Sequence, residues 1–125
     1  MNSYHDYNIY KYEVDSSSQE IKMCLREHHG AHEVQLVFSG VVGHLLEHAL
    51  GGNIILEFCE DDVEVFYESA SNELKRYQKY GLPLDASTKE KFAHDMSTKQ
   101  LKCFSLSTSY GLSGWVLAVS VGESA

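Results

Sequence analysis

Residues 53–81, NIILEFCEDDVEVFYESASNELKRYQKYG, predict both a strand and a helix, because the spacing of their apolar residues changes part-way along. Large apolar residues occupy every second position in its first part, and this period of two predicts a β-strand over 53–60. After Asp61 they recur every three or four residues, which predicts an amphipathic helix over 63–80. The apolar stripe of that helix comprises Val63, Phe66, Tyr67, Ala70, Leu74 and Tyr77.

Capping residues indicate where this helix begins and ends, and where a second one begins. Asp61 is the expected N-cap, because an Asp side chain accepts hydrogen bonds from the first free backbone amides of a helix. Gly81, followed by Pro83, is expected to end the helix. Residues 87–90, Ser-Thr-Lys-Glu, form a capping box, which predicts a second helix over 88–96.

Segments with a period of two flank the helices on both sides and predict the strands. They cover residues 8–14, 20–27, 34–42 and 53–60 before the helices, and 101–108 and 114–121 after them. Apolar residues on both faces of 34–42 and 114–121 indicate strands in the interior of a sheet. We therefore predict one α+β domain over 1–125, with a mainly antiparallel sheet, the order ββββααββ and both helices packed on that sheet.

Composition and charge narrow the class of function. The chain has 125 residues, 43% of them hydrophobic, which suits one globular domain. Its formal net charge of −8 argues against nucleic-acid binding, which depends on Lys and Arg, and favours a basic partner. No apolar run approaches the roughly 20 residues that a membrane-spanning helix requires.

The cysteines and the N-terminal residues indicate the compartment. Cys24, Cys59 and Cys103 are odd in number, lack paired spacing, and each lies in a predicted strand, so we interpret them as structural free thiols. The first residues lack the basic-then-apolar order of a signal peptide. Both observations predict a cytoplasmic protein. The sequence carries no catalytic or cofactor signature, so we expect a protein that is not an enzyme and needs no cofactor or metal.

Six carboxylates crowd into residues 57–68, a segment without Lys or Arg. They are Glu57, Glu60, Asp61, Asp62, Glu64 and Glu68. Carboxylates at a helix start interact favourably with its macrodipole. Glu57 and Glu68 lie outside the first turn, however, and Glu64 and Glu68 form an unfavourable like-charge pair. We therefore predict that these six residues form a docking face for a basic protein. Binding of a divalent cation is a less favoured alternative, because the segment lacks the spacing of an EF-hand.

Histidines supply a second hypothesis, of a different class. His44-Leu45-Leu46-Glu47-His48 matches the H-x-x-E-H pattern, in which two histidines one helical turn apart bind zinc beside a general-base Glu. This would make the chain a small metal-dependent hydrolase or ligand-binding protein. Residues 44–50 lie between glycines and are expected to form an irregular turn or a single helical turn. His28, His29 and His32, in a predicted loop, are candidates for adventitious metal binding.

Three further segments resemble those of known proteins: FSGVVGH (residues 38–44), GNIIL (52–56) and SYGLSGWV (109–116). Together they resemble a group of small bacterial proteins, some of which look like immunity proteins of polymorphic or contact-dependent toxin systems. The resemblance covers residues 8–121 and carries no catalytic residues. It implies a cytosolic, non-enzymatic protein that blocks a cognate toxin domain by binding at or beside its active site. A structural or interaction module with another partner is the remaining alternative.

Overall fold

The computed structural model describes residues 4–47, 55–108 and 113–124. Before the helices lie β1 (Tyr7–Asp15), β2 (Glu20–Glu27), β3 (Glu33–Ser39), β4 (Gly43–Glu47) and β5 (Ile55–Asp61). There follow α1 (Val63–Gln78), α2 (Lys89–Thr98), β6 (Lys102–Thr108), β7 (Ser113–Ala118) and β8 (Ser120–Ser124). The predicted α+β class is confirmed. The predicted order ββββααββ is wrong, because β4 is an additional strand and the segment 114–121 contributes to two strands rather than one.

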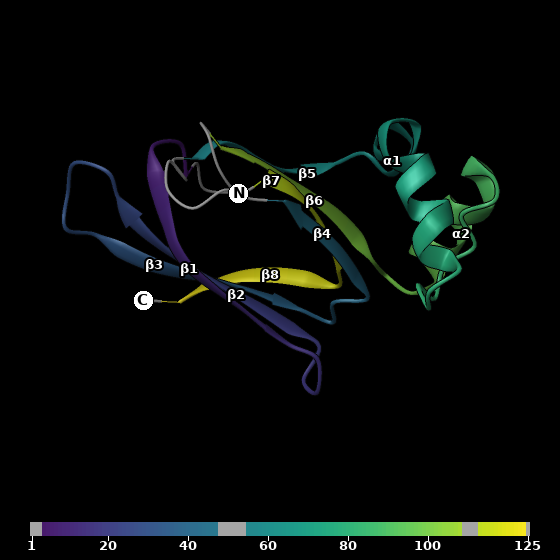
Figure 1. Cartoon of the computed structure of the whole chain (residues 1–125), viewed down its shortest axis with the longest axis horizontal. Helices are drawn as coiled ribbons and strands as arrows, with labels where there is room; N and C mark the ends of the chain where they lie inside the picture. The colour runs from purple at the N-terminus through teal and green to yellow at the C-terminus, as the bar shows by residue number, and fades with distance from the viewer. Residues whose placement is uncertain (1–3, 48–54, 109–112, 125) are drawn as a thin grey trace.

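The strands form two antiparallel sheets, not the one that the sequence predicted. The first sheet has the order β1-β2-β3-β8 and the second the order β4-β7-β6-β5. β3 and β7 are interior strands, as the apolar residues on both their faces predicted, whereas β8 is an edge strand. Figure 1 shows the two sheets diverging from a shared bend, with both helices together at one end of the molecule.

One long bent pair of strands joins the two sheets. β3 pairs with β8 up to Ser39 and Ser120, and β4 pairs with β7 from Gly43 and Leu117. Between these two pairs, three residues separate Ser39 from Gly43 but only two separate Leu117 from Ser120. The segment between β3 and β4 therefore carries one extra residue at the bend. An extra residue of this kind bends a strand and increases its local twist.

Gly40 and Val119 lie close together at this bend. Gly40 has a φ of +65°, and a Cβ atom there would lie 2.7 Å from Val119 Cγ2. The Val119 amide donates to the Ser39 carbonyl at 3.0 Å. Val119 itself belongs to neither β7 nor β8. The segment 114–121 therefore divides between the two sheets at this residue.

The two sheets enclose one apolar core and the helices enclose another. The inner faces of the sheets contribute Ile21, Met23, Leu25, Leu36, Phe38, Phe104 and Val116 to the first core. The second core lies between the helices and the outer face of the second sheet, and includes Phe66, Leu74, Phe92, Met96, Cys103, Trp115 and Leu117. The helices therefore pack on a sheet as predicted, and the helix residues predicted to face the core are buried or half-buried.

Two local predictions need correction. The N-cap of α1 is Asp62, not Asp61: Asp62 Oδ1 accepts from the backbone amides of Glu64 at 3.0 Å and Val65 at 3.2 Å. The period of two over 8–14 predicts that Tyr10, Tyr12 and Val14 share one face of their strand. In β1, an irregularity between Ile9 and Lys11 instead separates Tyr10 from Tyr12 and Val14, and its side chain is 44% exposed. The Tyr10 ring instead lies 4.3 Å from the guanidinium carbon of Arg26, a cation–π contact.

Candidate functional site

The six carboxylates of the predicted docking face lie along one edge of the second sheet and the helix that follows it. β5 is the edge strand, and α1 begins two residues after it ends. Asp61 is half-buried, and the other five, Glu57, Glu60, Asp62, Glu64 and Glu68, are exposed. The structure therefore brings them to the surface as a continuous segment.

The strand divides these carboxylates between its two faces. Asp61 pairs with Cys103, which belongs to the core beneath the helices, so Asp61 lies on the outer face of the sheet. Glu60 pairs with Phe104, which belongs to the core between the sheets, so Glu60 lies on the inner face. The predicted single face is thus two surfaces: Glu60 alone on one side, and the remaining five toward the helix side and along α1.

Two of the six have structural partners. Asp62 caps α1, and such a cap stabilises a helix by about 1 kcal/mol. Glu68 Oε1 lies 3.1 Å from Lys89 Nζ, an exposed ion pair between α1 and α2. Among the residues that the structure describes, Glu57, Glu60, Asp61 and Glu64 form no ion pair with Lys or Arg. No direct ion pair within the described residues therefore neutralises these four carboxylates, although Lys89 also interacts electrostatically with Glu64.

The carboxylates also affect the pKa of the neighbouring thiol of Cys103. Burial, with the nearby carboxylates of Asp61, Glu60 and Asp62, raises the pKa of this thiol to about 12. The side chain therefore stays a neutral thiol and packs as an apolar group, in keeping with the structural interpretation of the cysteines.

Cys59, on β5, is held among oxygen atoms. Its Sγ lies 3.4 Å from Ser105 Oγ, 3.2 Å from Asp61 Oδ1 and 3.6 Å from Glu57 Oε1, and its single proton can be donated to either carboxylate. The hydrogen bond with Ser105 lowers the pKa of the thiol, but burial and the hydrogen bonds to the two carboxylates outweigh it and raise the pKa above its ordinary value. A protonated thiol is a poor nucleophile, so this geometry holds the two carboxylates rather than activating the cysteine.

The H-x-x-E-H segment lies on a strand, not on the helical turn that the motif requires. His44 and Glu47 belong to β4, and residues three apart on a strand point to opposite faces of the sheet. His48 lies outside the described residues. The turn predicted over 44–50 is therefore wrong for residues 44–47. Because His44 and Glu47 lie on a strand, they lack the helical spacing by which the motif places its residues around one zinc ion.

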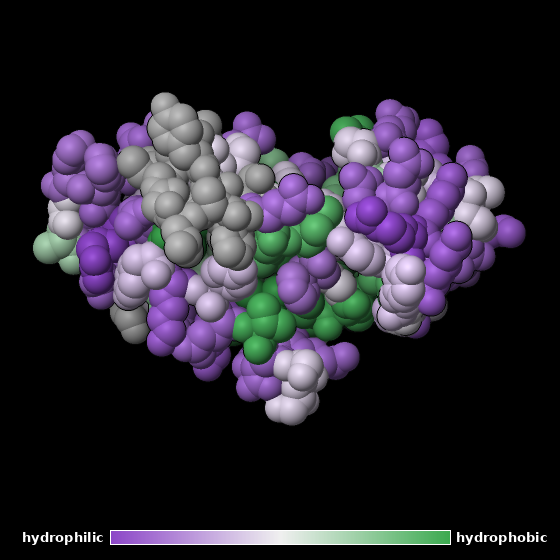
Figure 2. Space-filling view, in the orientation of Figure 1, coloured by the Kyte–Doolittle hydropathy of each residue, from purple (hydrophilic) through white to green (hydrophobic). Residues whose placement is uncertain are grey.

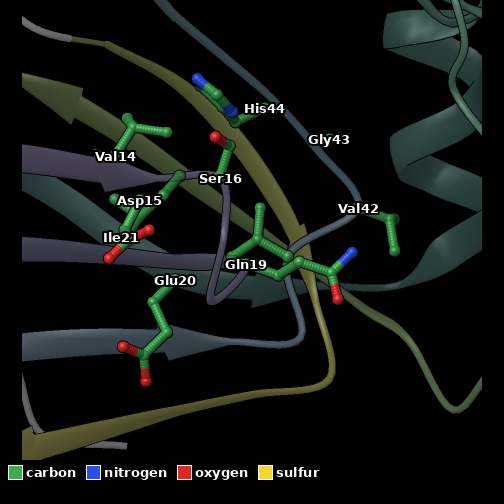
Figure 3. A pocket seen from close by; sticks show the side chains of 10 residues that line it. Val14, Asp15, Ser16, Gln19, Glu20, Ile21, Val42, Gly43 and His44 are labelled. Carbon is green, nitrogen blue, oxygen red and sulfur yellow. The ribbon is translucent and has the colours of Figure 1, made fainter.

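His44 instead borders a pocket at the bend between the sheets. The pocket has a volume of about 230 Å³ and lies against the β1–β2 turn, with His44, Ser16, Val14 and Ile21 around it (Figure 3). Partial burial lowers the pKa of the His44 imidazole, because burial disfavours the charged form of the ring. Hydrophobic residues gather on the same side of the molecule, between the sheets and the helices (Figure 2).

The other histidine cluster remains in a turn, as predicted, between the ends of β2 and β3. The rings of His28 and His29 lie 4.1 Å apart, whereas His32 packs edge-on against Tyr7 at 6.3 Å. All three side chains are exposed. Over 4–47, 55–108 and 113–124, no group of three or more His, Cys, Asp or Glu residues is placed to hold a metal ion.

A second opening lies on the inner side of β5, where Glu60 was found. It is a cleft of about 400 Å³ between β5 and β8, the edge strands of the two sheets. Its walls include Tyr4, Leu36, Phe58 and Glu123. Sequence reasoning missed Tyr4 and Glu123 because they stand 119 residues apart and neither belongs to a local motif.

Comparison of the chain with models of protein families, with curated proteins and with solved structures found no match. The resemblance to immunity proteins therefore stays a prediction. In the part of the chain that the structure describes, neither helix is long and apolar enough to cross a membrane.

Proposed function

We propose that this chain is a non-enzymatic binding protein that recognises a basic protein, and that the partner is a toxin domain neutralised by the contact. The observation that carries the proposal is a set of four carboxylates, Glu57, Glu60, Asp61 and Glu64, on the edge strand β5 and the start of α1. Within the described part of the chain, none of the four forms an ion pair with Lys or Arg. A lone surface charge is ordinary. Four in eight residues create a local negative field that a basic surface would complement.

The negative charge of this segment also indicates which class of protein would bind it. An enzyme that acts on nucleic acid lines its active site with Lys and Arg, because these residues hold phosphates. A protein that presents carboxylates on a rigid strand edge and helix start mimics those phosphates and occupies the same residues. The resemblance in residues 8–121 to immunity proteins supports this choice of partner, and three free cysteines suit the reducing cytosol in which such a protein would act.

Electrostatics would act mainly on the speed of binding. Complementary charges steer two proteins toward the correct encounter and raise the association rate by orders of magnitude at low salt, whereas exposed charge pairs add little to affinity. A basic partner should therefore associate quickly with this chain, and added salt should slow the association strongly.

The first test is capture followed by neutralisation. The tagged full chain is used at low salt to isolate binding proteins from its native host, which are identified by mass spectrometry. The gene for the captured protein is then expressed with and without the chain. The proposal predicts a stoichiometric basic protein whose toxicity disappears on co-expression. A captured protein that is acidic, or whose toxicity is unchanged, contradicts it.

A charge-reversal pair tests the surface itself. The edge variant carries Glu57→Lys, Asp61→Lys and Glu64→Lys, and it spares the helix cap Asp62 and the inward-facing Glu60. Its control carries Glu13→Lys, Glu33→Lys and Glu47→Lys, which lie on other strands and are exposed. Each reversal adds two charges, so both variants have a formal net charge of −2 instead of −8. The edge variant should bind the captured partner about tenfold more weakly at low salt, and the control should bind it almost normally.

A further inference from the structure

The exposed face of α1 carries opposite charges toward its two ends. The exposed charged side chains over 63–79 are acidic in the N-terminal half and basic in the C-terminal half: Glu64, Glu68, Lys75, Arg76 and Lys79. Between the two groups lie Ser69 and Asn72, which are exposed, short and uncharged. The helix macrodipole favours this order of charges, but its effect falls off within the first and last turns. Glu68 lies beyond the first turn, so the macrodipole alone does not account for it.

Each end of this face also contains two like charges one helical turn apart. Glu64 and Glu68 form one such pair, and Lys75 and the C-cap Lys79 form the other. Like charges four residues apart destabilise a helix. The ion pair with Lys89 of α2, at 3.1 Å, partly offsets the charge of Glu68. Over the described residues, Lys75 and Lys79 form no ion pair, so none offsets the repulsion at the basic end.

Two large apolar side chains are exposed on the same helix, one toward each end. Val65 lies in the first turn and is 64% exposed, and Tyr80 follows the C-cap and is 81% exposed. The Tyr80 amide donates to the Tyr77 carbonyl at 2.9 Å, so the turn continues to Tyr80. Positions 65, 72 and 80 are about two helical turns apart, which brings them to one face of α1. Because the surface around the helices is largely hydrophilic (Figure 2), these two side chains leave apolar area there that contact with another molecule would bury.

The charges and apolar side chains of this face are placed symmetrically about Asn72. Glu68 precedes Asn72 by four residues, and Arg76 follows it by four. Val65 and Lys79 likewise stand seven residues to either side. If two copies of α1 lie side by side in opposite directions, with the two Asn72 residues adjacent, each Glu68 therefore meets Arg76 of the second copy. Each Val65 then meets the aliphatic stem of Lys79.

We propose that a second copy of this chain docks on the exposed face of α1, with the two helices antiparallel and a twofold axis at Asn72. In this arrangement the acidic ends contact the basic ends, and Val65 packs against the Tyr80 ring of the second copy. A twofold interface forms each of these contacts twice. The second copy would also lie beside Glu64, one of the carboxylates of the proposed function. Self-association needs no other protein, however, so its absence would leave the proposed function standing.

The oligomeric state of the full chain gives the first test. Sedimentation velocity at physiological salt is measured over a series of protein concentrations up to about 1 mM, the range in which weak contacts through exposed ion pairs are populated. We expect the sedimentation coefficient to rise from that of a monomer toward that of a dimer and no further, because a twofold interface is closed. A chain that remains monomeric throughout, or that grows beyond a dimer, overturns the proposal.

A charge reversal tests the face and separates it from the effect of net charge. Glu68→Arg places two cations opposite each other at both contacts and should raise the dissociation constant of the dimer about tenfold or more. It also changes the formal net charge from −8 to −6, which by itself would favour association. Glu47→Arg, at an exposed position on β4, makes the same change of net charge and is the matched control. Equal dissociation constants for the two variants overturn the proposal.

Restoring opposite charges at the contacts should restore the dimer. Glu68→Arg combined with Arg76→Glu exchanges the two charges, keeps the net charge of −8 and should return the dissociation constant to within about threefold of the wild type. An equimolar mixture of the two single variants should dimerise at least about tenfold more tightly than either variant alone, since one chain then carries only cations at these positions and the other only anions. If the double variant or the mixture fails to recover while the amide NMR spectra keep the dispersion of a folded chain, the proposal is overturned.

Discussion

The Tyr4 hydroxyl donates a hydrogen bond to Glu123 Oε2 at 2.5 Å and so links the two ends of the chain. Tyr4 is 6% exposed and belongs to the core between the sheets, whereas Glu123 lies on β8, the last strand. The bond holds the edge of the first sheet against the N-terminal segment. It also orients a carboxylate at the mouth of the cleft between β5 and β8.

Removal of the Tyr4 hydroxyl should lower the free energy of unfolding without leaving a cavity in the core. Tyr4→Phe keeps the ring and loses the hydrogen bond to Glu123, so we expect the free energy of unfolding to fall by about 1 kcal/mol. Urea denaturation measures the change. Tyr80→Phe is the control, because the Tyr80 side chain is 81% exposed, and it should change stability by less than about 0.5 kcal/mol. Equal stability of the two variants would contradict a structural role for the bond.

The choice between Asp61 and Asp62 as the cap of α1 can be measured directly. Asp62→Ala removes the acceptor for the amides of Glu64 and Val65 and should lower the free energy of unfolding by about 1 kcal/mol. Asp62→Asn keeps an acceptor oxygen and should lower it by less. In the same urea experiment Asp61→Ala should be milder than Asp62→Ala, and the reverse order would restore Asp61 as the cap.

Gly114 on β7 and Gly122 on β8 should respond differently to the same substitution. Gly114 has a φ of +146°, and a Cβ atom there would lie 1.7 Å from the Leu45 carbonyl oxygen. Gly114→Ala should therefore lower stability by roughly 3 kcal/mol or more, through backbone strain and a clash that only strand separation relieves. Nothing lies within 4 Å of a Cβ atom at Gly122, so Gly122→Ala should be nearly neutral. Thermal melting of both variants measures the contrast, and similar melting temperatures would refute this register of β4 and β7.

The buried thiol of Cys103 makes stability depend on pH in the alkaline range. Burial raises its pKa to about 12 in the folded chain, so the unfolded chain loses this proton at a lower pH than the folded one. The stabilisation is complete below the unfolded pKa, close to 9, and is lost progressively as the pH rises from there toward 12. Between pH 9 and pH 10 we expect a loss of about 1 kcal/mol from this group.

Cys103→Ala tests that dependence. The variant should be less stable than the wild type at pH 7.5, because a buried side chain is shortened, but its stability should fall less steeply between pH 9 and pH 10. Urea denaturation at a series of pH values gives both curves. Parallel curves for the two proteins would show that the thiol stays protonated in the unfolded chain as well, or that it ionises equally in both states.

The sequence predicted the elements whose signals are local. α1 was found because four buried residues recur at helical spacing between an acidic start and Gly81. Its cap was missed by one residue, since Asp61 and Asp62 have the same side chain and only the backbone conformation distinguishes them. β4 was missed because its five residues carry little alternation, and because His44 and Glu47 matched a helical motif.

The division into two sheets depends on pairing between distant segments. Residues 115–119 are continuously apolar, so nothing local marks Val119 as the point where the chain leaves one sheet for the other. The candidate site likewise depends on segments that are distant in the sequence. Glu60 has the parity of Phe58, and this alone would have placed it on the inner face, but the contribution of Tyr4 and Glu123 follows only from the tertiary fold.

We propose that the carboxylates on β5 and α1 steer a basic protein onto this chain. The most direct test is the association rate constant of the captured partner, measured by stopped flow at low and at physiological salt for the wild type, the edge variant and its control. We predict that the edge variant associates at least about tenfold more slowly at low salt and loses most of its salt dependence, while the control, with the same net charge, resembles the wild type. Equal rates for the two variants would show that only net charge matters, and would contradict steering by the carboxylates of β5 and α1.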